Sequence, residues 1–378
     1  MYSVLDYGRM LADGVRVAAY REALAAAVRP GAVVVDLGAG TGFFALEACR
    51  LGAGKVYAIE TNDAIGILPA LARRNGFADR IEVIQRPSTE VTLARKADVI
   101  VADLRGVVPI FEANAAVMAD ARSRLLAPGG VMIPERDTLF AAVLEAPAAY
   151  ARLAGGWEGH GLDLSDARAA CLHAFASDRD APFRPEQLVT AGAPWAELVY
   201  GAEAPALFER SVELAVTRSA TAHGVVLWFD AILHGMIGYS TAPGYDRVYG
   251  RAFLPWEEPV DVEIGDAVTL DLCARRAADD HVWAWSTTVR RGEAVRASFR
   301  QSTFLATVTT AASLMKEASS YAPRLGAGGR ATAAILAAMD GSASVADIAR
   351  DAHERHPGAF ASADEALEAV RRLAKKYG

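Results

Sequence analysis

Cysteine is scarce in this sequence of 378 residues, and the three that occur, Cys49, Cys171 and Cys273, have no paired spacing. Disulfide frameworks and cysteine-based metal sites depend on regularly spaced cysteines, so the sequence favours neither. We interpret the three as core thiols of a cytoplasmic protein and expect no metal.

Long apolar runs and an excess of positive charge are also missing. The N-terminal stretch mixes charges among its apolar residues, unlike a signal peptide or a membrane span, so we expect no membrane partner. The net charge of −7 gives no electrostatic footprint for nucleic acid, so we expect no nucleic-acid partner either. The length allows two or three globular domains.

Strands and helices alternate in the first third of the sequence. Apolar runs predict strands at 33–37, 55–60, 81–85 and 98–102, and helices at 10–28, 44–51, 65–75 and 113–126, the last closed by Pro128-Gly129-Gly130. This alternation is typical of a parallel, doubly wound sheet. We predict a Rossmann-like α/β domain over residues 1–134.

The pattern changes at Val131 to short runs rich in Val, Leu, Phe and Trp. Those at 225–233, 267–272, 282–289 and 298–305 predict an antiparallel β domain over residues 135–308, interrupted by an inserted arm at about 155–190. We assign residues 309–325 to a linker. Residues 326–378 then form a small, mostly helical module, because Ser344 and Ser362 each begin a capping-box pattern.

The strongest motif is VVDLGAGTGF at 34–43, a strand that leads through Gly38, Gly40 and Gly42 into a helix. Such glycines allow a tight turn and close approach of a ligand, and a dinucleotide fold uses a similar loop. The acid before them, Asp36, suits an ammonium or sulfonium group better than a pyrophosphate. The motif therefore favours S-adenosyl-L-methionine as cofactor.

Two further positions are candidates for contact with the nucleoside of this cofactor. Glu60 ends the second strand, where a carboxylate can accept both ribose hydroxyls. Thr89 and Glu90 follow the third strand, where polar groups could meet the adenine amine. The alternatives are a solvated acid at a strand end for Glu60 and an ordinary polar turn for the other two.

The first helix carries a family pattern. Met10, Leu11, Asp13, Arg16 and Tyr20 match the Met-Leu-x-Asp-x-x-Arg-x-x-x-Tyr pattern of the protein arginine methyltransferases, and the sequence resembles that family from about residue 2 to residue 305. The resemblance implies a β-barrel domain, a homodimer formed through the arm, and binding of the cofactor's methionine carboxylate by Arg16. A helix-surface arginine is the alternative.

The loop after the fourth strand carries two acids. In VADLRGVVPIFE, Asp103, Gly106 and Glu112 have the spacing of the family's double-glutamate loop. The resemblance implies that Asp103 and Glu112 grip the guanidinium of the acceptor, which localises its charge and leaves another nitrogen free to attack the methyl group. The alternative is a loop cap and an acid at a helix start.

Three departures from the family keep the acceptor open. The first acid is an aspartate, Arg105 replaces an apolar residue, and Arg247-Val248-Tyr249 replaces Thr-His-Trp. An arginine guanidino group of a peptide or protein is the leading acceptor, and an N-terminal α-amine is the alternative. A non-catalytic peptide-binding protein that retains the cofactor fold is a competing hypothesis. A nucleic-acid base methyltransferase is disfavoured, because the Asn/Asp-Pro-Pro-Tyr motif is missing.

The C-terminal segment 326–378 lies outside this resemblance. Its apolar helix, the turn at Asp340-Gly341 and the pair Val345 and Ile348 resemble PqqD-like modules, which bind leader peptides during maturation of ribosomally made peptides. The resemblance implies that the substrate is a precursor peptide whose leader segment is held by this module. A helical appendage that only packs on the barrel is the alternative.

Overall fold

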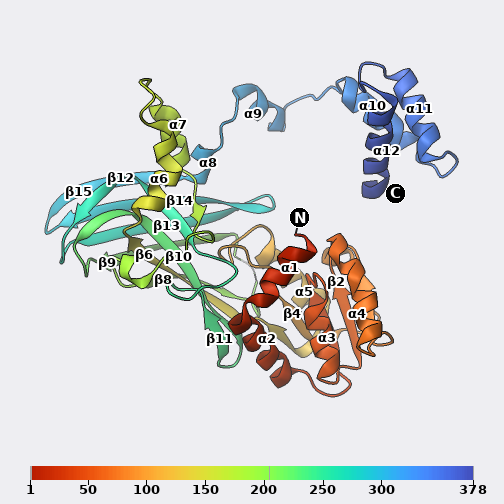
Figure 1. Ribbon diagram of the computed structural model, residues 1–378, viewed down its shortest axis with the longest axis horizontal. Coiled ribbons are helices and arrows are strands. Elements are labelled where there is room, and N and C mark those ends of the chain that lie inside the picture. Colours follow the sequence, from red (N-terminus) through yellow and green to blue (C-terminus); the bar gives the residue numbers. More distant parts are fainter. Residues whose placement is uncertain (1, 204, 378) are drawn as a thin grey trace. The chain divides into compact units, whose positions relative to one another are not determined.

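The computed structural model describes residues 2–203 and 205–377. The chain divides between Val308 and Thr309 into two compact units (Figure 1). The segment 309–325, predicted as a linker, lies in the second unit and contains helix α9 (Ala311–Glu317).

The first unit begins with a parallel sheet in the order β3-β2-β1-β4-β5. Its strands are β1 (Val33–Leu37), β2 (Lys55–Ile59), β3 (Ile81–Ile84), β4 (Ala97–Ala102) and β5 (Leu126–Ile133). Helix α2 (Gly14–Ala27) precedes the first strand. The helices between the strands are α3 (Phe43–Arg50), η1 (Asp63–Ile67) with α4 (Leu68–Arg74), η2 (Ser88–Glu90) and α5 (Asn114–Arg124). The strand order reverses between β1 and β4, where open α/β sheets bind ligands.

Two expectations for this region were wrong in detail. The helix predicted over 10–28 is two helices, α1 (Val4–Ala12) and α2, because Asp13 caps α2 by accepting a hydrogen bond from the N–H of Arg16 at 3.2 Å. Residues 128–130 do not close helix α5, which ends at Arg124. They lie within β5, where the pairing with β4 shifts register between Ala97 and Val99.

The predicted antiparallel β domain is present as two sheets around a shared core. One has the order β7-β12-β10-β6-β8, with β11 paired to β10, and the other has the order β15-β14-β13-β9. The strands are β6 (Arg136–Leu144), β7 (Ala176–Ser177), β8 (Ala193–Val199), β9 (Leu207–Ala215), β10 (Ala220–His234), β11 (Ile237–Ser240), β12 (Ala252–Val262), β13 (Ala267–Ala277), β14 (Asp280–Arg291) and β15 (Ala294–Ser302). Helix α8 (Thr303–Ala306) follows.

The segment between β6 and β8 is irregular, with short helices and strand β7. It contains α6 (Pro147–Ala154), η3 (Gly155–Trp157), α7 (Ser165–Leu172) and η4 (Pro185–Gln187). A small apolar cluster that includes Tyr150, Phe183 and Phe253 attaches it to the six-stranded sheet. This segment corresponds to the predicted arm.

The second unit contains α10 (Ala327–Ala337), α11 (Val345–Arg355) and α12 (Ala363–Tyr377) around a core that includes Ile335, Ile348 and Val370. Both capping serines act as predicted on the main chain, since their hydroxyls accept the N–H groups of Asp347 and Glu365 at 3.2 Å.

No helix in the described parts of the chain is both long enough and apolar enough to cross a membrane. Of the three cysteines, only Cys49 is buried. Cys171 and Cys273 are half-buried, so the expectation of three core thiols was wrong for these two.

Candidate active site

The glycine loop lies between β1 and α3, at the reversal of strand order. Gly38, Gly40 and Gly42 have φ values of 70°, 54° and 84°, a region that glycine adopts at little cost. A Cβ on Gly40 would lie 2.4 Å from the ring of Tyr7, and a Cβ on Gly38 would lie 2.3 Å from Leu104. The loop is therefore contacted from one side by helix α1 and from the other by the segment after β4.

Asp36 lies in β1, just before these glycines, and is 1% exposed. Its Oδ2 accepts a hydrogen bond from the N–H of Ala45 at 2.8 Å, in the first turn of α3. Burial raises the pKa of Asp36 to about 7, aided by the negative charge of Glu60 and opposed by the Ala45 hydrogen bond. A positively charged ligand group nearby would favour the ionised form.

Glu60 follows β2 and reaches back to the glycine loop. Its Oε2 accepts the N–H of Gly40 at 2.8 Å, and its Oε1 accepts the N–H groups of Thr61 and Asn62 at 2.7 and 2.8 Å. The side chain of Asn62 donates to the carbonyl of Tyr2 at 2.8 Å. This network joins the end of β2, the glycine loop and the segment that leads into α1.

Thr89 and Glu90 lie in η2, after β3, with exposed side chains. The guanidinium of Arg124 fixes this turn by donating to the carbonyls of Ser88 and Val91 at 2.7 and 2.8 Å. The adenine contact of Thr89 and Glu90 stays a prediction.

Arg16 lies on α2 and is 5% exposed. Its Nε and Nη2 contact Oδ2 of Asp103 at 2.7 and 2.5 Å, and its Nη1 donates to the carbonyl of Met10 at 3.0 Å. The residue predicted to bind the cofactor carboxylate is thus held by a carboxylate of the protein. A methionine carboxylate in this place would share Arg16 with Asp103.

Asp103 is surrounded by donors. The Tyr249 hydroxyl contacts both of its oxygens at 2.7 Å, and Nη1 of Arg105 reaches Oδ1 at 3.3 Å. Burial alone would raise the pKa of Asp103, but the charges of Arg16 and Arg105 and these hydrogen bonds hold it below its ordinary value. Asp103 is therefore an anion whose oxygens already have partners inside the protein.

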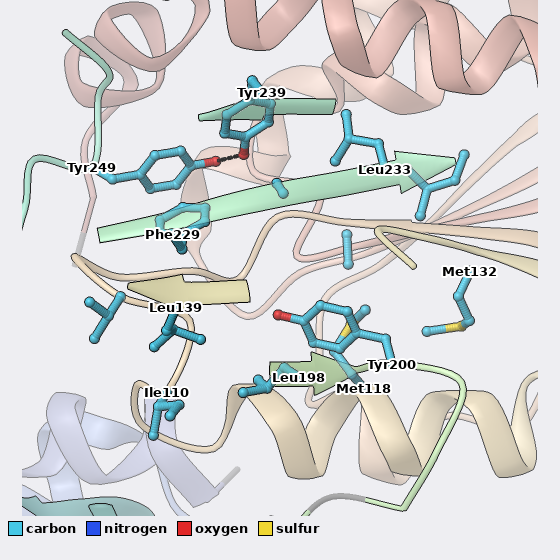
Figure 2. Close-up of a cluster of buried hydrophobic side chains, with 14 of the residues drawn as sticks. Ile110, Met118, Met132, Leu139, Leu198, Tyr200, Phe229, Leu233, Tyr239 and Tyr249 are labelled. Carbon is cyan, nitrogen blue, oxygen red and sulfur yellow. Dashed lines mark hydrogen bonds between the residues drawn. The ribbon is translucent and has the colours of Figure 1, made fainter. Parts of the chain in front are cut away.

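Tyr249 was not among the residues that the sequence pointed to. It is the last residue of the segment that departs from Thr-His-Trp, and only its position there could have drawn attention to it. Burial raises the pKa of Tyr249 well above its ordinary value, so its hydroxyl keeps its proton. Figure 2 shows Tyr249 beside Phe229, with its hydroxyl joined to that of Tyr239 at 2.8 Å.

Arg105 makes its closest ionic contacts with Asp137, and not with Asp103 or Glu112. Its Nε and Nη2 donate to the two oxygens of Asp137 on β6, both at 2.7 Å, and the Tyr200 hydroxyl donates to the same carboxylate at 2.7 Å. Because Asp137 supplies the close counter-charge, the longer contact of Arg105 with Asp103 is the weaker of the two.

Glu112 is exposed and has φ of 42°, an uncommon value for a residue other than glycine. Its N–H donates to Oδ1 of Asp280 at 3.1 Å. Across residues 2–203 and 205–377, no hydrogen bond or ion pair joins Glu112 to Asp103. The structure brings Asp103 together with Arg16, but it does not pair the two predicted acids.

In the same described ranges, no group of three or more His, Cys, Asp or Glu residues is arranged to hold a metal ion.

Comparisons with known proteins show that this chain is similar to methyltransferases. The model of the ribosomal protein L11 methyltransferase family matches residues 21–134. A probable protein arginine N-methyltransferase 6 of Arabidopsis thaliana is 27% identical over 237 residues, which cover 60% of this chain and 54% of that protein. An arginine N(omega)-methyltransferase of Streptomyces achromogenes subsp. streptozoticus is 28% identical over 276 residues, 70% of this chain and 74% of that protein.

Solved structures share the fold over most of this chain. The Trypanosoma brucei PRMT1 enzyme-prozyme complex with AdoHcy has a TM-score of 0.70 at 22% identity, covering 78% of this chain and 97% of that one. Arabidopsis thaliana protein arginine methyltransferase 10 has a TM-score of 0.69 at 21% identity, covering 79% and 97%. The fold is that of a Rossmann-like methyltransferase with a β-barrel domain, and the chain is a methyltransferase with S-adenosyl-L-methionine as its cofactor.

Proposed function

We propose that this S-adenosyl-L-methionine-dependent methyltransferase acts on a nitrogen of a peptide or protein, with the arginine guanidino group as the leading acceptor. The observation that carries the proposal is the meeting of the glycine loop, Arg16 and the two-acid loop at the reversal of strand order. The similarity to proteins named as arginine methyltransferases gives independent support.

We assign cofactor binding to residues around the glycine loop, which form the cofactor half of the site. The glycine loop, with Gly38, Gly40 and Gly42, lets the main chain approach the cofactor, and Asp36 balances its cationic methionine part. Glu60 holds the ribose, Thr89 and Glu90 approach the adenine, and Arg16 binds the methionine carboxylate. When bound, the cofactor would supply a methyl group on its sulfonium. Transfer to the acceptor nitrogen would leave the cofactor as a neutral thioether, and the nitrogen would give up a proton.

The acceptor half is assigned to Asp103 and Glu112. Glu112 is exposed, and within the described residues its carboxylate has no hydrogen-bond or ion-pair partner, so it is available to a cationic acceptor. Asp103 is anionic and fixed, which lets it shape the pocket without moving. Because guanidinium charge is delocalised, an acid on one nitrogen favours charge there and leaves lone-pair density on the nitrogen that attacks.

An α-amine of a peptide is the second candidate acceptor. The observation that favours it is the engagement of both Asp103 oxygens by Arg16, Arg105 and Tyr249, which leaves little capacity for a bidentate guanidinium. A smaller ammonium could be served by Glu112 alone.

Incubation with isotope-labelled donor and a panel of acceptors tests the proposal. The panel contains arginine peptides, the same peptides with lysine in place of arginine, and N-acetylated copies of both. It also contains free arginine, because the Streptomyces relative is an arginine N(omega)-methyltransferase whose name does not specify a protein substrate. We expect transfer to arginine peptides that N-acetylation does not abolish. Transfer that is lost on N-acetylation would support the α-amine, and transfer to no member would contradict the proposal.

Two variants separate the role of Glu112 from a general effect of charge. Glu112→Gln is expected to lower kcat by at least tenfold. Glu293→Gln, which removes an exposed acid in the turn between β14 and β15, is expected to leave kcat unchanged. Equal turnover of both variants would remove Glu112 from the mechanism.

We also propose that the C-terminal module is PqqD-like and binds the leader segment of a precursor peptide. Its support is the separate compact core around Ile335, Ile348 and Val370, which suits a binding module. A chain that ends at residue 308 should show a raised KM for a precursor with its leader and an unchanged KM for the leader-free peptide. Equal KM values for the precursor in the short and full chains would contradict this role.

A further inference from the structure

The loop after β4, residues 103–113, leads into α5 at Asn114 and is held at both ends by one buried network. Near its start, Arg105 donates two hydrogen bonds to Asp137, both at 2.7 Å. At its end, Nδ2 of Asn114 donates to the Tyr200 hydroxyl at 3.3 Å, and that hydroxyl donates to Asp137 at 2.7 Å. We propose that Asp137 is a positioning residue for this loop, an inference that rests on the proposed methyl transfer.

Asp137 lies on a part of the molecule that cannot easily move. It belongs to β6, which is paired on both sides, with Asp137 opposite Ala231 of β10 and Leu198 of β8. It is 0% exposed and accepts three hydrogen bonds from side chains. The acceptor loop is thereby attached to the central strands of the barrel sheet.

The loop also connects the two halves of the site through three consecutive residues. Asp103 pairs with Arg16, Leu104 packs on Gly38 of the cofactor loop, and Arg105 pairs with Asp137. The orientation of Arg105 therefore determines how the loop lies between the cofactor half and the barrel.

Two further contacts close this arrangement. The Tyr20 hydroxyl accepts from Nη1 of Arg105 at 2.7 Å and donates to the carbonyl of Ala102 at 2.9 Å. The ring of Phe111 packs where a Cβ of Gly106 would lie, at 2.5 Å, so the loop folds on itself. Little of the loop is free to adjust independently of Arg105.

Loss of the Asp137 charge has a specific consequence in this geometry. Arg105 is buried, and the acid left within its reach is Asp103, at 3.3 Å. A buried guanidinium without its partner will draw on the remaining carboxylate. Asp103 would then turn from Arg16 toward Arg105, and the loop would shift away from the acceptor.

If the pair of Arg105 and Asp137 only stabilised the fold, restoring stability would also restore kcat. Buried ion pairs are often replaceable by apolar residues of similar volume with little loss of stability. The double variant Arg105→Met/Asp137→Ala should therefore recover the melting temperature that Asp137→Asn loses. If the pair positions the loop, kcat stays reduced in the double variant.

The test compares Asp137→Asn and this double variant with a matched control. The control is Asp266→Asn, because Asp266 is 2% exposed and accepts two hydrogen bonds from Arg291, on the other sheet. We expect at least a tenfold loss of kcat in both Asp137 variants, with affinity for S-adenosylhomocysteine within threefold of wild type. Asp266→Asn should lower the melting temperature and leave kcat unchanged.

Hydrogen exchange gives a readout that does not depend on activity. The backbone amides of residues 104–108 and 110–113 should exchange faster in Asp137→Asn and not in Asp266→Asn. Wild-type kcat in the double variant, or unchanged exchange in Asp137→Asn, would overturn the inference. If the wild-type protein methylates no acceptor, the proposed function fails, whereas the exchange experiment still decides whether Asp137 positions the loop.

Discussion

At the scale of single residues, the site depends on buried charges whose environments differ. Asp36 has little to stabilise its anion, and its pKa is raised to about 7. Asp103 is surrounded by cations and a phenol, and its pKa is lowered. The sequence could indicate both acids by their positions, but it could not show that Asp103 already has partners, since Tyr249 lies 146 positions away.

The first prediction concerns the pH dependence of cofactor binding. Because Asp36 is partly protonated near pH 7 when the site is empty, and a cationic ligand favours its anion, binding should release protons. Affinity for S-adenosylhomocysteine should rise from pH 6 to pH 8, as measured by calorimetry in buffers of different ionisation enthalpy. Binding without proton exchange at pH 7 would contradict this role.

The second prediction concerns the stability of the empty protein. Because the folded protein favours the neutral carboxyl, the contribution of Asp36 to stability is fully present only below its ordinary pKa of 3.8. It is lost as the pH rises from there to about 7. A tenfold change in the acid dissociation constant on folding corresponds to about 1.4 kcal/mol of stability. Asp36→Asn should therefore exceed wild type in melting temperature at pH 8 by more than it does at pH 5, because only part of the loss has occurred at pH 5. An equal difference at both pH values would exclude this titration.

The third prediction concerns the opposite case, Asp103. Asp103→Ala leaves Arg16 without its buried acid, which should lower the free energy of unfolding by about 3 to 5 kcal/mol. Glu197→Ala removes an exposed partner of Arg136 and should cost less than about 1 kcal/mol. Urea unfolding measures both, and similar losses would mean that Asp103 is not held as described.

At the scale of elements, hydrophobic periodicity was sufficient for β1 to β4 of the parallel sheet, because each is a short apolar run between turn residues. It missed β5, whose Pro128-Gly129-Gly130 was interpreted as the end of a helix. Periodicity was insufficient where a single side chain determines the bounds of an element. Asp13, for example, caps α2 and divides the predicted helix in two. The pair of Arg105 and Asp137 was also missed, because it joins a loop to a strand of the other domain. No periodic signal reports such a contact.

The fourth prediction concerns the glycine loop. Gly40→Ala should abolish cofactor binding, because its Cβ meets Tyr7 and its φ is 54°. Gly31→Ala is the control, since Gly31 has φ of 81° with nothing within 4 Å. It should cost about 1 to 2 kcal/mol of stability and leave affinity unchanged, as checked by calorimetry and urea unfolding. Wild-type cofactor affinity in Gly40→Ala would contradict this prediction, because the Tyr7 ring would then have moved away from the loop to make room for the Cβ.

At the scale of the whole molecule, the resemblance to arginine methyltransferases covers the first unit, and the structural similarity extends over 78% of the chain. The second unit has its own core. The family resemblance also implies a homodimer through the arm, where Trp157 and Leu162 are 40% and 74% exposed. Exposed apolar side chains mark a possible contact surface, but the pattern of one sequence does not identify the partner that covers them.

The fifth prediction concerns this arm. Leu162→Asp should convert a two-chain assembly to single chains in light scattering, because a buried charge would destabilise an apolar contact. Met236→Asp changes a side chain that is 98% exposed in the turn between β10 and β11 and should leave the mass unchanged. A wild-type protein with the mass of one chain would contradict the dimer.

The central claim is methyl transfer to a peptide nitrogen at the site where Arg16 pairs with Asp103, with Glu112 further along the same loop as the acid that meets the acceptor. Fragmentation mass spectrometry of a peptide incubated with donor and enzyme tests it most directly. The account predicts the added mass of one methyl group on an arginine side chain, lost with Glu112→Gln and retained with Glu293→Gln. An unmodified peptide, or equal modification by both variants, would contradict it.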